Sequence, residues 1–566
     1  MVESEDSKSF YKQGGWAPIK DQYINPERYK TENNDLENRK RENVNDEKVL
    51  AKKQKKSPPL TCPNIIQPFS TSTKFDLIRK CPYGDTCKLS HDNSEFITFE
   101  PPISEKCPVL LSKHVCPSGP VCCWSKTHEE VGKTDESPKA EYLEDVDICG
   151  CNNRLDLKLK QKLRKKAYPY PASNSVLKVF GQKNSDLTSY VEREKPKLTF
   201  KGKTYLAPLT TVGNLPFRRI CIDQGVDITC SEMAMVTHLL QGIPREWALL
   251  KRHSSEKLFG VQVCGNFPDT MTKCCQLMEE NCEFDFVDVN CGCPIDAVFN
   301  SGCGSGLMKN HERLTKIAIC MDSVLKKASV TIKMRAGIHN NKNTAHTLMM
   351  DLAKAGCVSL VSIHGRSREQ RYSKLADWNY IKECRDNLQA QYSSLTETDK
   401  VVRRMEIFGN GDILSHQDYE EFLECSNVDG CMIGRGALIK PWIFKEIKER
   451  RVFDISSTER LDIIKDFVHY GLEHWGSDQR GVDSTRRFLL EWLSFTHRYI
   501  PVGLLERLPQ KINEPPPPYF GRDDKETLLA SNKASDWIKI SEMFLGKAQD
   551  SFNFVPRHKA NSYVNV

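Results

Sequence analysis

The chain has 566 residues, a formal net charge of +7 and 23 cysteines. Its length exceeds that of one domain and predicts about three or four, and the mild positive charge is compatible with a nucleic-acid partner without indicating one. The polar, acidic start, Met1–Asp6, and the lack of any run near ~18 apolar residues predict neither a secretory signal nor membrane insertion. We therefore expect a reducing compartment, where clustered Cys and His residues indicate metal binding or catalysis.

Residues 1–60 are dense in charges of both signs and poor in apolar side chains, which predicts a disordered tail. The basic run at 52–56 is a nuclear signal, a phosphate contact or an ordinary solvated charge run. We expect a cytoplasmic protein, with nuclear entry indicated by this run alone.

Two Cys/His clusters lie within residues 61–130. The first comprises Cys62, Cys81, Cys87 and His91, and the second comprises Cys107, Cys116, Cys122 and His128. Three thiolates and an imidazole suit tetrahedral Zn2+, and loops this small have little core without a metal. A Pro-x-Gly-x-x-Cys frame recurs in both clusters, so the segment resembles a pair of CCCH zinc fingers, a family that typically binds RNA.

Both clusters depart from that family's usual spacing. Eighteen residues separate Cys62 from Cys81, and five residues rather than three precede His128. Cys123 could replace Cys122 as a ligand. Free surface thiols are the alternative, but the repeated spacing argues against them.

Residues 131–196 are predicted to form a basic linker. The stretch 154–166 within it holds seven basic residues and one acidic residue. It is either a helix with phosphate contacts or a solvated helix face.

Residues 197–450 alternate short apolar, β-branched runs with helical stretches. The eight runs are Thr204–Leu209, Ile228–Met233, Phe259–Gly265, Phe284–Asn290, Val330–Arg335, Leu360–His364, Glu406–Asn410 and Gly430–Gly434. Eight β/α units over about 250 residues match a TIM (β/α)8 barrel, and the alternation implies a parallel sheet. The pattern does not show closure, so a doubly wound sheet is the alternative.

Nearly every run ends in a polar or reactive residue. These ends are Pro208-Leu209-Thr210, Glu232, Gln262, Asn290 with Cys293, Lys333 with Arg335, His364, Asn410, and Gly434-Arg435. In a barrel the carboxyl ends of all strands meet on the face that carries active sites. We therefore expect these side chains to line one site.

The turn Asn290–Pro294 presents a thiol directly after the fourth run. Gly292 permits a sharp turn or a close approach to a ligand, and Pro294 fixes the exit direction. A lone cysteine at a strand end is more often a buried structural residue. Here the ring of polar strand ends around Cys293 favours a functional thiol.

The turns after the last two runs, Phe408–Asp412 and Ile433–Gly436, are rich in glycine. Backbone N–H groups can approach a phosphate there and Arg435 can add charge, which predicts a phosphorylated cofactor such as FMN. Two ordinary tight turns are the alternative. The segment 301–306 looks like a dinucleotide motif but follows no strand, so we discount it and expect any nicotinamide cofactor to visit rather than reside.

Several motifs occur in order along this region. They are Leu206–Thr210, Asn290–Pro294, Lys333-Met334-Arg335, Ile363–Arg366 and the two glycine turns. Together they resemble the tRNA-dihydrouridine synthases, which use FMN on a TIM barrel to reduce uridine in tRNA. The zinc-finger pair before the barrel is similar to the eukaryotic branch of that family, which acts on uridine 47.

The resemblance implies a role for most of the strand-end residues. Cofactor contacts are implied for Pro208, Leu209, Thr210, Gln262, Lys333, His364, Asn410, Gly411, Asp412, Gly434 and Arg435. Of these, Gln262 and Lys333 would contact the flavin ring, with Lys333 stabilising negative charge on its reduced form. Asn290 and Arg335 would bind the substrate, and Cys293 would be the catalytic proton donor.

The resemblance also implies the chemistry. NADPH, or NADH, reduces FMN, flavin N5 delivers hydride to uracil C6, and Cys293 protonates C5. Such general-acid help is typically worth about 10² to 10⁴ in rate. The thiol must be neutral before transfer, and Cys291 is expected to be a bystander. A stacked uridine cannot reach the flavin, so we expect it to be extruded into the pocket.

Residues 451–548 are predicted to form a small helical domain, which by resemblance binds tRNA, and 549–566 a tail. The apolar stripe of its first helix comprises Leu461, Ile464, Phe467, Val468 and Leu472. The candidate RNA contacts are Arg486, Arg487, His497 and Arg498, although each alone is more often a solvated surface residue.

Two other functions explain part of the chain. A small-molecule flavin oxidoreductase of the dihydroorotate-dehydrogenase type explains the barrel but not the fingers. A non-catalytic CCCH RNA-binding protein explains the fingers but not the ring of strand-end residues. We expect a monomeric reductase of tRNA with no membrane contact; whether mRNA is also a substrate, and whether NADPH or NADH is preferred, stays open.

Overall fold

The computed structural model describes residues 15–25, 69–70, 106–128, 150–182, 185–187, 190, 198–394, 404–550 and 552–557. The chain divides into two compact units. The first comprises Met1–Cys149, Asp454–Leu508 and Glu514–His558, and the second comprises Gly150–Phe453, Pro509–Asn513 and Lys559–Val566. No helix in the described ranges is long and apolar enough to cross a membrane.

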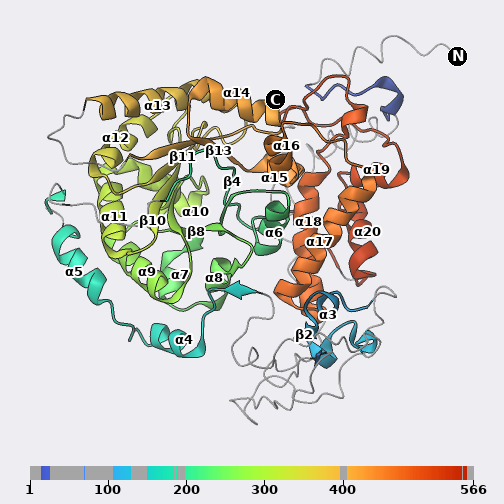
Figure 1. Ribbon diagram of the computed structural model, residues 1–566, viewed down its shortest axis with the longest axis horizontal. Coiled ribbons are helices and arrows are strands. Elements are labelled where there is room, and N and C mark those ends of the chain that lie inside the picture. The colour runs from blue at the N-terminus through green and yellow to red at the C-terminus, as the bar shows by residue number, and fades with distance from the viewer. Residues whose placement is uncertain are drawn as a thin grey trace, which may run out of the picture. The chain divides into compact units, whose positions relative to one another are not determined.

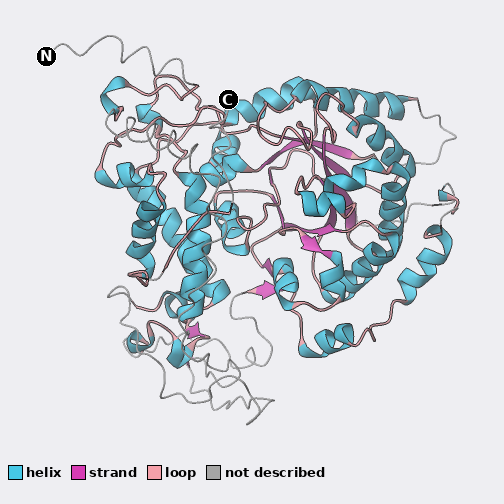
Figure 2. Ribbon diagram, turned by 180° about the vertical axis from the view of Figure 1, so that it is seen from behind, coloured by secondary structure: helices cyan, strands magenta, loops and turns pink. Residues whose placement is uncertain are grey.

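The second unit is a closed barrel of eight parallel strands (Figures 1 and 2). In order around the barrel these are β4 (Tyr205–Leu206), β5 (Ile228–Cys230), β8 (Leu258–Cys264), β9 (Phe286–Cys291), β10 (Ser329–Arg335), β11 (Leu360–His364), β12 (Glu406–Asn410) and β13 (Gly430–Ile433). Ile228 pairs with Tyr205 on one side and with Leu258 on the other, which closes the sheet. The predicted TIM barrel is confirmed, and the doubly wound alternative is excluded.

Helices surround the strands in Figure 1. They include α6 (Leu215–Asp223), α9 (Pro268–Asn281), α11 (His311–Val324), α12 (Ala345–Ala355), α13 (Trp378–Ser393) and α14 (His416–Ser426). Because the strands are covered on both faces, they read in sequence as continuous apolar runs rather than alternating ones.

Aromatic rings fill the amino-terminal end of the barrel. Phe200 and Tyr205 pack edge-on against Phe286, with ring centroids 5.5 and 6.0 Å apart, and Tyr205 also meets Phe408 at 6.2 Å. All four side chains are fully buried. This plug leaves the carboxyl ends of the strands as the open face of the barrel.

Part of the segment expected to be a linker is helical. Asp156 caps α4 (Leu157–Arg164), which buries Leu159 and Leu163 and leaves most of its basic side chains exposed. The following helix, α5 (Pro171–Phe180), packs against α9 and α11. Its fully buried Ser173 donates its N–H to Gln276 Oε1 at 2.8 Å, so this segment is part of the barrel unit.

The first unit contains four C-terminal helices, as predicted in outline. They are α17 (Ser457–Trp475), α18 (Gln479–Thr496), α19 (Asp524–Leu529) and α20 (Ala534–Leu545). Ser456 and Glu459 form a capping box that begins α17. Ile464, Phe467 and Leu472 of the predicted stripe are buried, and α18 packs against both α17 and α20.

Three of the four candidate RNA contacts in this unit are buried, which corrects the prediction. Arg486 donates to Ser541 Oγ at 2.7 Å and to the carbonyl of Leu545 at 3.1 Å. It thereby supplies a hydrogen-bond donor to a carbonyl at the end of α20 that has no partner within the helix. His497 and Arg498 are also buried. Of the four, only Arg487 is exposed.

Residues 15–25 differ from the disorder predicted for 1–60. Ala17 and Ile19 are buried in a cluster with Leu504. The N–H of Ala17 donates to the carbonyl of Pro515, and the N–H of Lys20 donates to that of Leu504. A few apolar residues within a charged stretch therefore suffice to hold this segment on the helical unit. The basic run at 52–56 lies outside the described residues, and so does the first zinc cluster with Cys62, Cys81, Cys87 and His91.

Candidate active site and metal centre

The strand register brings the predicted site residues together at the carboxyl ends of the barrel. Lys333 pairs with Asn290. On the other side of β10, Arg335 pairs with His364. His364 in turn pairs with Asn410. Neighbouring strands therefore present these residues at one level, as the sequence predicts.

The turn that carries Cys293 is held from both of its edges. Asn290 Oδ1 accepts the N–H groups of Gly292 at 3.1 Å and of Cys293 at 2.9 Å. Arg335 Nε donates to the carbonyl of Gly292 at 2.8 Å. Cys291, the last residue of β9, is fully buried, whereas Cys293 is partly exposed. Strand β9 ends at Cys291, and of the two thiols only that of Cys293, in the turn, is partly accessible.

The Cys293 thiol is favoured in its neutral form. Burial raises its pKa above the ordinary value, and the N–H of Ile295 with the charges of Arg335 and Lys333 opposes that rise without cancelling it. A neutral thiol is a proton donor rather than a nucleophile.

Lys333 lies partly buried in the same site. Burial lowers the pKa of its ammonium to about 8, and the charge of Arg335 acts in the same direction. Its Nζ is 3.5 Å from Asn410 Oδ1. Among the residues that the structure describes, no carboxylate forms an ion pair with it, so its charge can stabilise a negative group in the site.

Asp412 organises the predicted phosphate site. It has a positive φ of 58°, and its carboxylate accepts from Arg366 at 2.7 and 2.8 Å and from Arg435 at 2.7 Å. The Arg435 guanidinium also lies 4.2 Å from the centroid of the Tyr372 ring. Asp412 thus holds two guanidiniums in place rather than meeting a phosphate, which its own charge would repel.

Arg366 is a site residue that the prediction did not single out. It is fully buried, and its NH1 lies 3.3 Å from Nε2 of His364. Burial lowers the pKa of His364 well below its usual value, and the neighbouring cations act in the same direction, so its imidazole is neutral. The motif Ile363–Arg366 contained the only sequence signal for this arginine.

The loop that follows β4 approaches the last glycine turn. A Cβ built on Gly434 would lie 3.6 Å from Ala207 Cβ and 3.7 Å from Leu209 Cδ2. Pro208 and Leu209 are partly exposed beside it, and Thr210 is exposed. Thr211 has a φ of 72°, which is rare for a β-branched residue, and Glu232 accepts its N–H at 2.6 Å. Strand-end Glu232 therefore stabilises a strained loop at the site.

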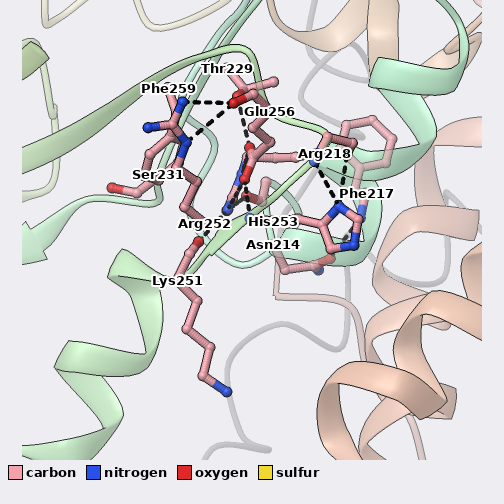
Figure 3. Close-up of polar contacts among 12 residues, drawn as sticks. Asn214, Phe217, Arg218, Thr229, Ser231, Lys251, Arg252, His253, Glu256 and Phe259 are labelled. Carbon is pink, nitrogen blue, oxygen red and sulfur yellow. Dashed lines mark hydrogen bonds and ion pairs between the residues drawn. The ribbon is translucent and has the colours of Figure 1, made fainter. Parts of the chain in front are cut away.

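A buried ion pair, drawn in Figure 3, contacts the end of this loop, where Arg218 NH1 donates to the carbonyl of Gly213 at 3.4 Å. Arg218 of α6 donates to Glu256 at 2.7 Å and to the carbonyl of Lys251 at 2.7 Å. Glu256 also accepts from Thr229 Oγ1 at 2.7 Å and from the N–H of His253 at 2.9 Å. Both partners of the pair are almost fully buried and well hydrogen-bonded, which is the condition under which such a pair is tolerated.

The second Cys/His cluster is a candidate metal centre in the first unit. The ligand atoms of Cys107, Cys116, Cys122 and His128 all lie within 4.8 Å of one another, and all four residues are buried. Three sulfurs and an imidazole are a donor set suited to Zn2+. Cys122, not Cys123, belongs to the cluster, which settles the choice that the sequence left open.

Comparison with known proteins identifies the family. Residues 205–494 match the model described as Dihydrouridine synthase (Dus). A tRNA-dihydrouridine(47) synthase-like protein of Xenopus laevis is 47% identical over 539 residues, which cover 89% of this chain and 80% of that protein. The like-named Homo sapiens protein is 45% identical over 554 residues, covering 89% and 81% of the two chains. The tRNA-dihydrouridine(47) synthase of Coprinopsis cinerea is 53% identical over 403 residues, covering 70% and 59%. The chain belongs to the dihydrouridine synthase family.

Proposed function

We propose that the protein is an NAD(P)H-dependent flavoenzyme that reduces a uridine of tRNA, at position 47, to 5,6-dihydrouridine. The observation that carries the proposal is the partly exposed, neutral Cys293 thiol, held on a fixed turn at the open face of the barrel. The names of the relatives support the same substrate and the same type of reductant.

The residues present fit FMN. Arg435, which Asp412 holds in place, offers a cation for its phosphate, fully buried Arg366 adds positive charge behind it, and the Gly434 turn leaves room for a close approach. Lys333, whose Nζ lies 3.5 Å from Asn410 Oδ1, offers an ammonium that forms no ion pair with a carboxylate in the part of the chain that the structure describes. When bound there, FMN supplies the hydride for uracil C6.

The chain itself supplies the proton and the orientation. Cys293 donates its thiol proton to C5, because burial keeps the thiol protonated at neutral pH. One N–H of the Asn290 amide donates to Gln262 Oε1 at 2.8 Å, and its second N–H is oriented by that bond and can meet the uracil. Arg335 Nε and NH1 donate to the carbonyls of Gly292 and Ser367, so its first contribution is to fix the turn.

We assign Zn2+ to the Cys107, Cys116, Cys122 and His128 cluster, and RNA holding to the first unit together with the basic face of α4. Clustered cations bind phosphates in a salt-dependent way, whereas the base is read inside the barrel. This proposal places the chemistry inside the barrel and part of the affinity for folded RNA on the exposed basic side chains of α4.

An anaerobic absorbance titration tests the function. The purified chain is reconstituted with FMN, its spectrum is recorded before and after NADPH, and unmodified tRNA is then added. Bleaching by NADPH followed by reoxidation only with tRNA supports the proposal. Bleaching with no response to tRNA would favour a small-molecule flavin reductase. Failure to bind FMN would leave a non-catalytic RNA-binding protein.

A further inference from the structure

A chain of hydrogen bonds links the buried carboxylate of Asp288 to the turn that carries Cys293. Asp288 lies inside the barrel on β9 and is only 2% exposed. Its Oδ2 accepts from Gln262 Nε2 at 2.8 Å, and its Oδ1 accepts from Thr331 Oγ1 at 2.7 Å. Gln262 Oε1 then accepts from Asn290 Nδ2 at 2.8 Å. The chain ends at Asn290 Oδ1, which accepts the N–H of Cys293.

Asp288, at the buried end of this series of hydrogen bonds, sets the donor and acceptor of every bond in it. An ionised carboxylate accepts hydrogen bonds and cannot donate them, whereas each amide has one donating and one accepting end. Because Asp288 takes the NH2 end of Gln262, the carbonyl end of Gln262 must face Asn290. Asn290 therefore gives its NH2 end to Gln262 and turns its oxygen toward the backbone of the Cys293 turn.

The other edge of the turn is anchored independently. Ser305 Oγ donates to the carbonyl of Cys293 at 2.8 Å, and Arg335 Nε donates to the carbonyl of Gly292. Loss of the hydrogen bonds that begin at Asp288 would therefore release the N–H groups of the turn. The carbonyl groups of the turn would stay bound to Ser305 and Arg335. The expected defect is a shift of the thiol rather than a collapse of the site.

We propose that Asp288 is a positioning residue, which orients the Gln262 and Asn290 amides so that the Cys293 thiol is held at the place where its proton is transferred. The role in proton transfer rests on the proposed function, whereas the control of the turn does not. Asp288 is two side chains away from the turn and belongs to none of the motifs that indicate the site.

The test compares three variants. Asp288→Ala removes the carboxylate that accepts the first hydrogen bond of the series, from Gln262. Asp288→Asn keeps a carbonyl oxygen for Gln262, and its new NH2 group can donate to the Thr331 hydroxyl. Thr331→Val is the matched control, because it removes the other buried hydrogen bond of Asp288 and leaves the link to Gln262 intact.

The first readout needs no turnover. Each variant is treated with iodoacetamide, and the alkylation rate of the Cys293 peptide is followed by mass spectrometry. We expect the rate in Asp288→Ala to rise by about tenfold because a displaced, mobile thiol is more accessible. Asp288→Asn and Thr331→Val are expected to stay within about twofold of the parent chain.

The second readout separates the two half-reactions of the FMN-loaded chain. We expect Asp288→Ala to reduce flavin with NADPH at a near-normal rate and to lose about 100-fold in reoxidation by tRNA. Asp288→Asn is expected to recover most of that loss. Parent-like alkylation in folded Asp288→Ala would overturn the proposal, as would an Asp288→Asn variant as defective as Asp288→Ala, since charge rather than orientation would then matter. If tRNA reoxidises none of the proteins, the parent included, the proposed function fails while the alkylation result still decides the control of the turn.

Discussion

The hydroxyl of Ser477 lies 3.3 Å from the sulfur of Cys116. Ser477 occupies the turn between α17 and α18 and is almost fully buried. Its N–H donates to Ser118 Oγ at 3.1 Å, and its carbonyl accepts the N–H of Cys123 at 2.9 Å. Ser477 thus joins the candidate metal module to the turn of the helical hairpin, and Ser112 adds a second attachment by donating to Glu473 of α17 at 2.9 Å. A metal bound in the module would stabilise both parts.

Removal of the metal is expected to loosen this helical hairpin. A chelator that strips Zn2+ should lower the thermal midpoint of the first unit, followed by circular dichroism with zinc content measured in parallel, because the small module has little core of its own. Ser477→Ala should lower the unfolding free energy by about 1–2 kcal/mol. Ser484→Ala on the exposed side of α18 is the control. Identical melting with and without metal would contradict the coupling.

Replacement of the proposed proton donor should separate binding from chemistry. Cys293→Ala is expected to bind FMN and react with NADPH normally, because Cys293 is not among the residues that fit the flavin. Its reoxidation by tRNA should fall by about 10² to 10⁴, the usual contribution of a general acid. Stopped-flow absorbance measures both steps. A parent-like reoxidation rate would refute the assignment of Cys293, and parent-like reoxidation by Cys291→Ala is the expected control result.

The raised pKa of Cys293 predicts the pH dependence of that step. The folded environment favours the neutral thiol, so the proton donor is fully present through the neutral range and is lost only as the pH rises above the ordinary thiol pKa. We expect the reoxidation rate to be flat around pH 7 and to fall at alkaline pH. Iodoacetamide should alkylate Cys293 with a midpoint above that of a free cysteine. A midpoint in the neutral range would show that the thiol is a nucleophile instead.

Much of the fold and part of the site could be predicted because strand ends are visible in sequence. Apolar runs that stop at Arg335, His364 or Asn410 mark both the barrel and its open face, and the register confirms that these residues are neighbours. Asp288 escaped notice because a strand buried on both faces shows no alternation that would single it out. Ser477 escaped notice because 361 residues separate it from Cys116.

The buried arginines show a second limit of sequence. Arg218, Arg366 and Arg486 each satisfy partners that come from other elements, so their burial follows from tertiary contacts alone. A basic residue on a helix is usually exposed to solvent. Arg486 was therefore expected at the surface, whereas the structure buries it.

The Arg218–Glu256 pair, which contacts the end of the site loop, should be sensitive to loss of one partner. Arg218→Met leaves a buried carboxylate that still accepts from Thr229 and His253, and it should lower the unfolding free energy by about 3–5 kcal/mol. The matched control is Lys273→Met, which breaks the more exposed pair with Asp269 and should change stability by less than about 1 kcal/mol. Urea unfolding measures both. Equal losses of unfolding free energy in the two variants would show that burial does not determine how much each ion pair contributes to stability.

Asp288 should make the stability of the barrel depend on pH. Burial raises its pKa to about 6, against hydrogen bonds from Gln262 and Thr331 and the charge of Lys333, which lower it. Burial raises the pKa of Tyr205 on β4 and of Cys230 on β5, the charge of Asp288 in turn raises both further, and both groups stay neutral. The folded chain therefore binds the Asp288 proton more tightly than the unfolded chain does. This contribution to stability is fully present below pH ~4 and is lost as the pH rises through about 6.

Asp288→Asn lacks this titration, so its stability relative to the parent should rise across that window. A shift of about two pKa units corresponds to a relative gain of roughly 3 kcal/mol by pH 7, with no further change until Lys333 begins to titrate near its pKa of about 8. Urea unfolding of both proteins between pH 4 and pH 8 measures the difference. A constant difference would show that Asp288 has the same pKa in the folded and unfolded chains. If the unfolding free energy of Asp288→Asn rises relative to the parent as predicted, the ionised Asp288 carboxylate lowers the stability of the parent at neutral pH.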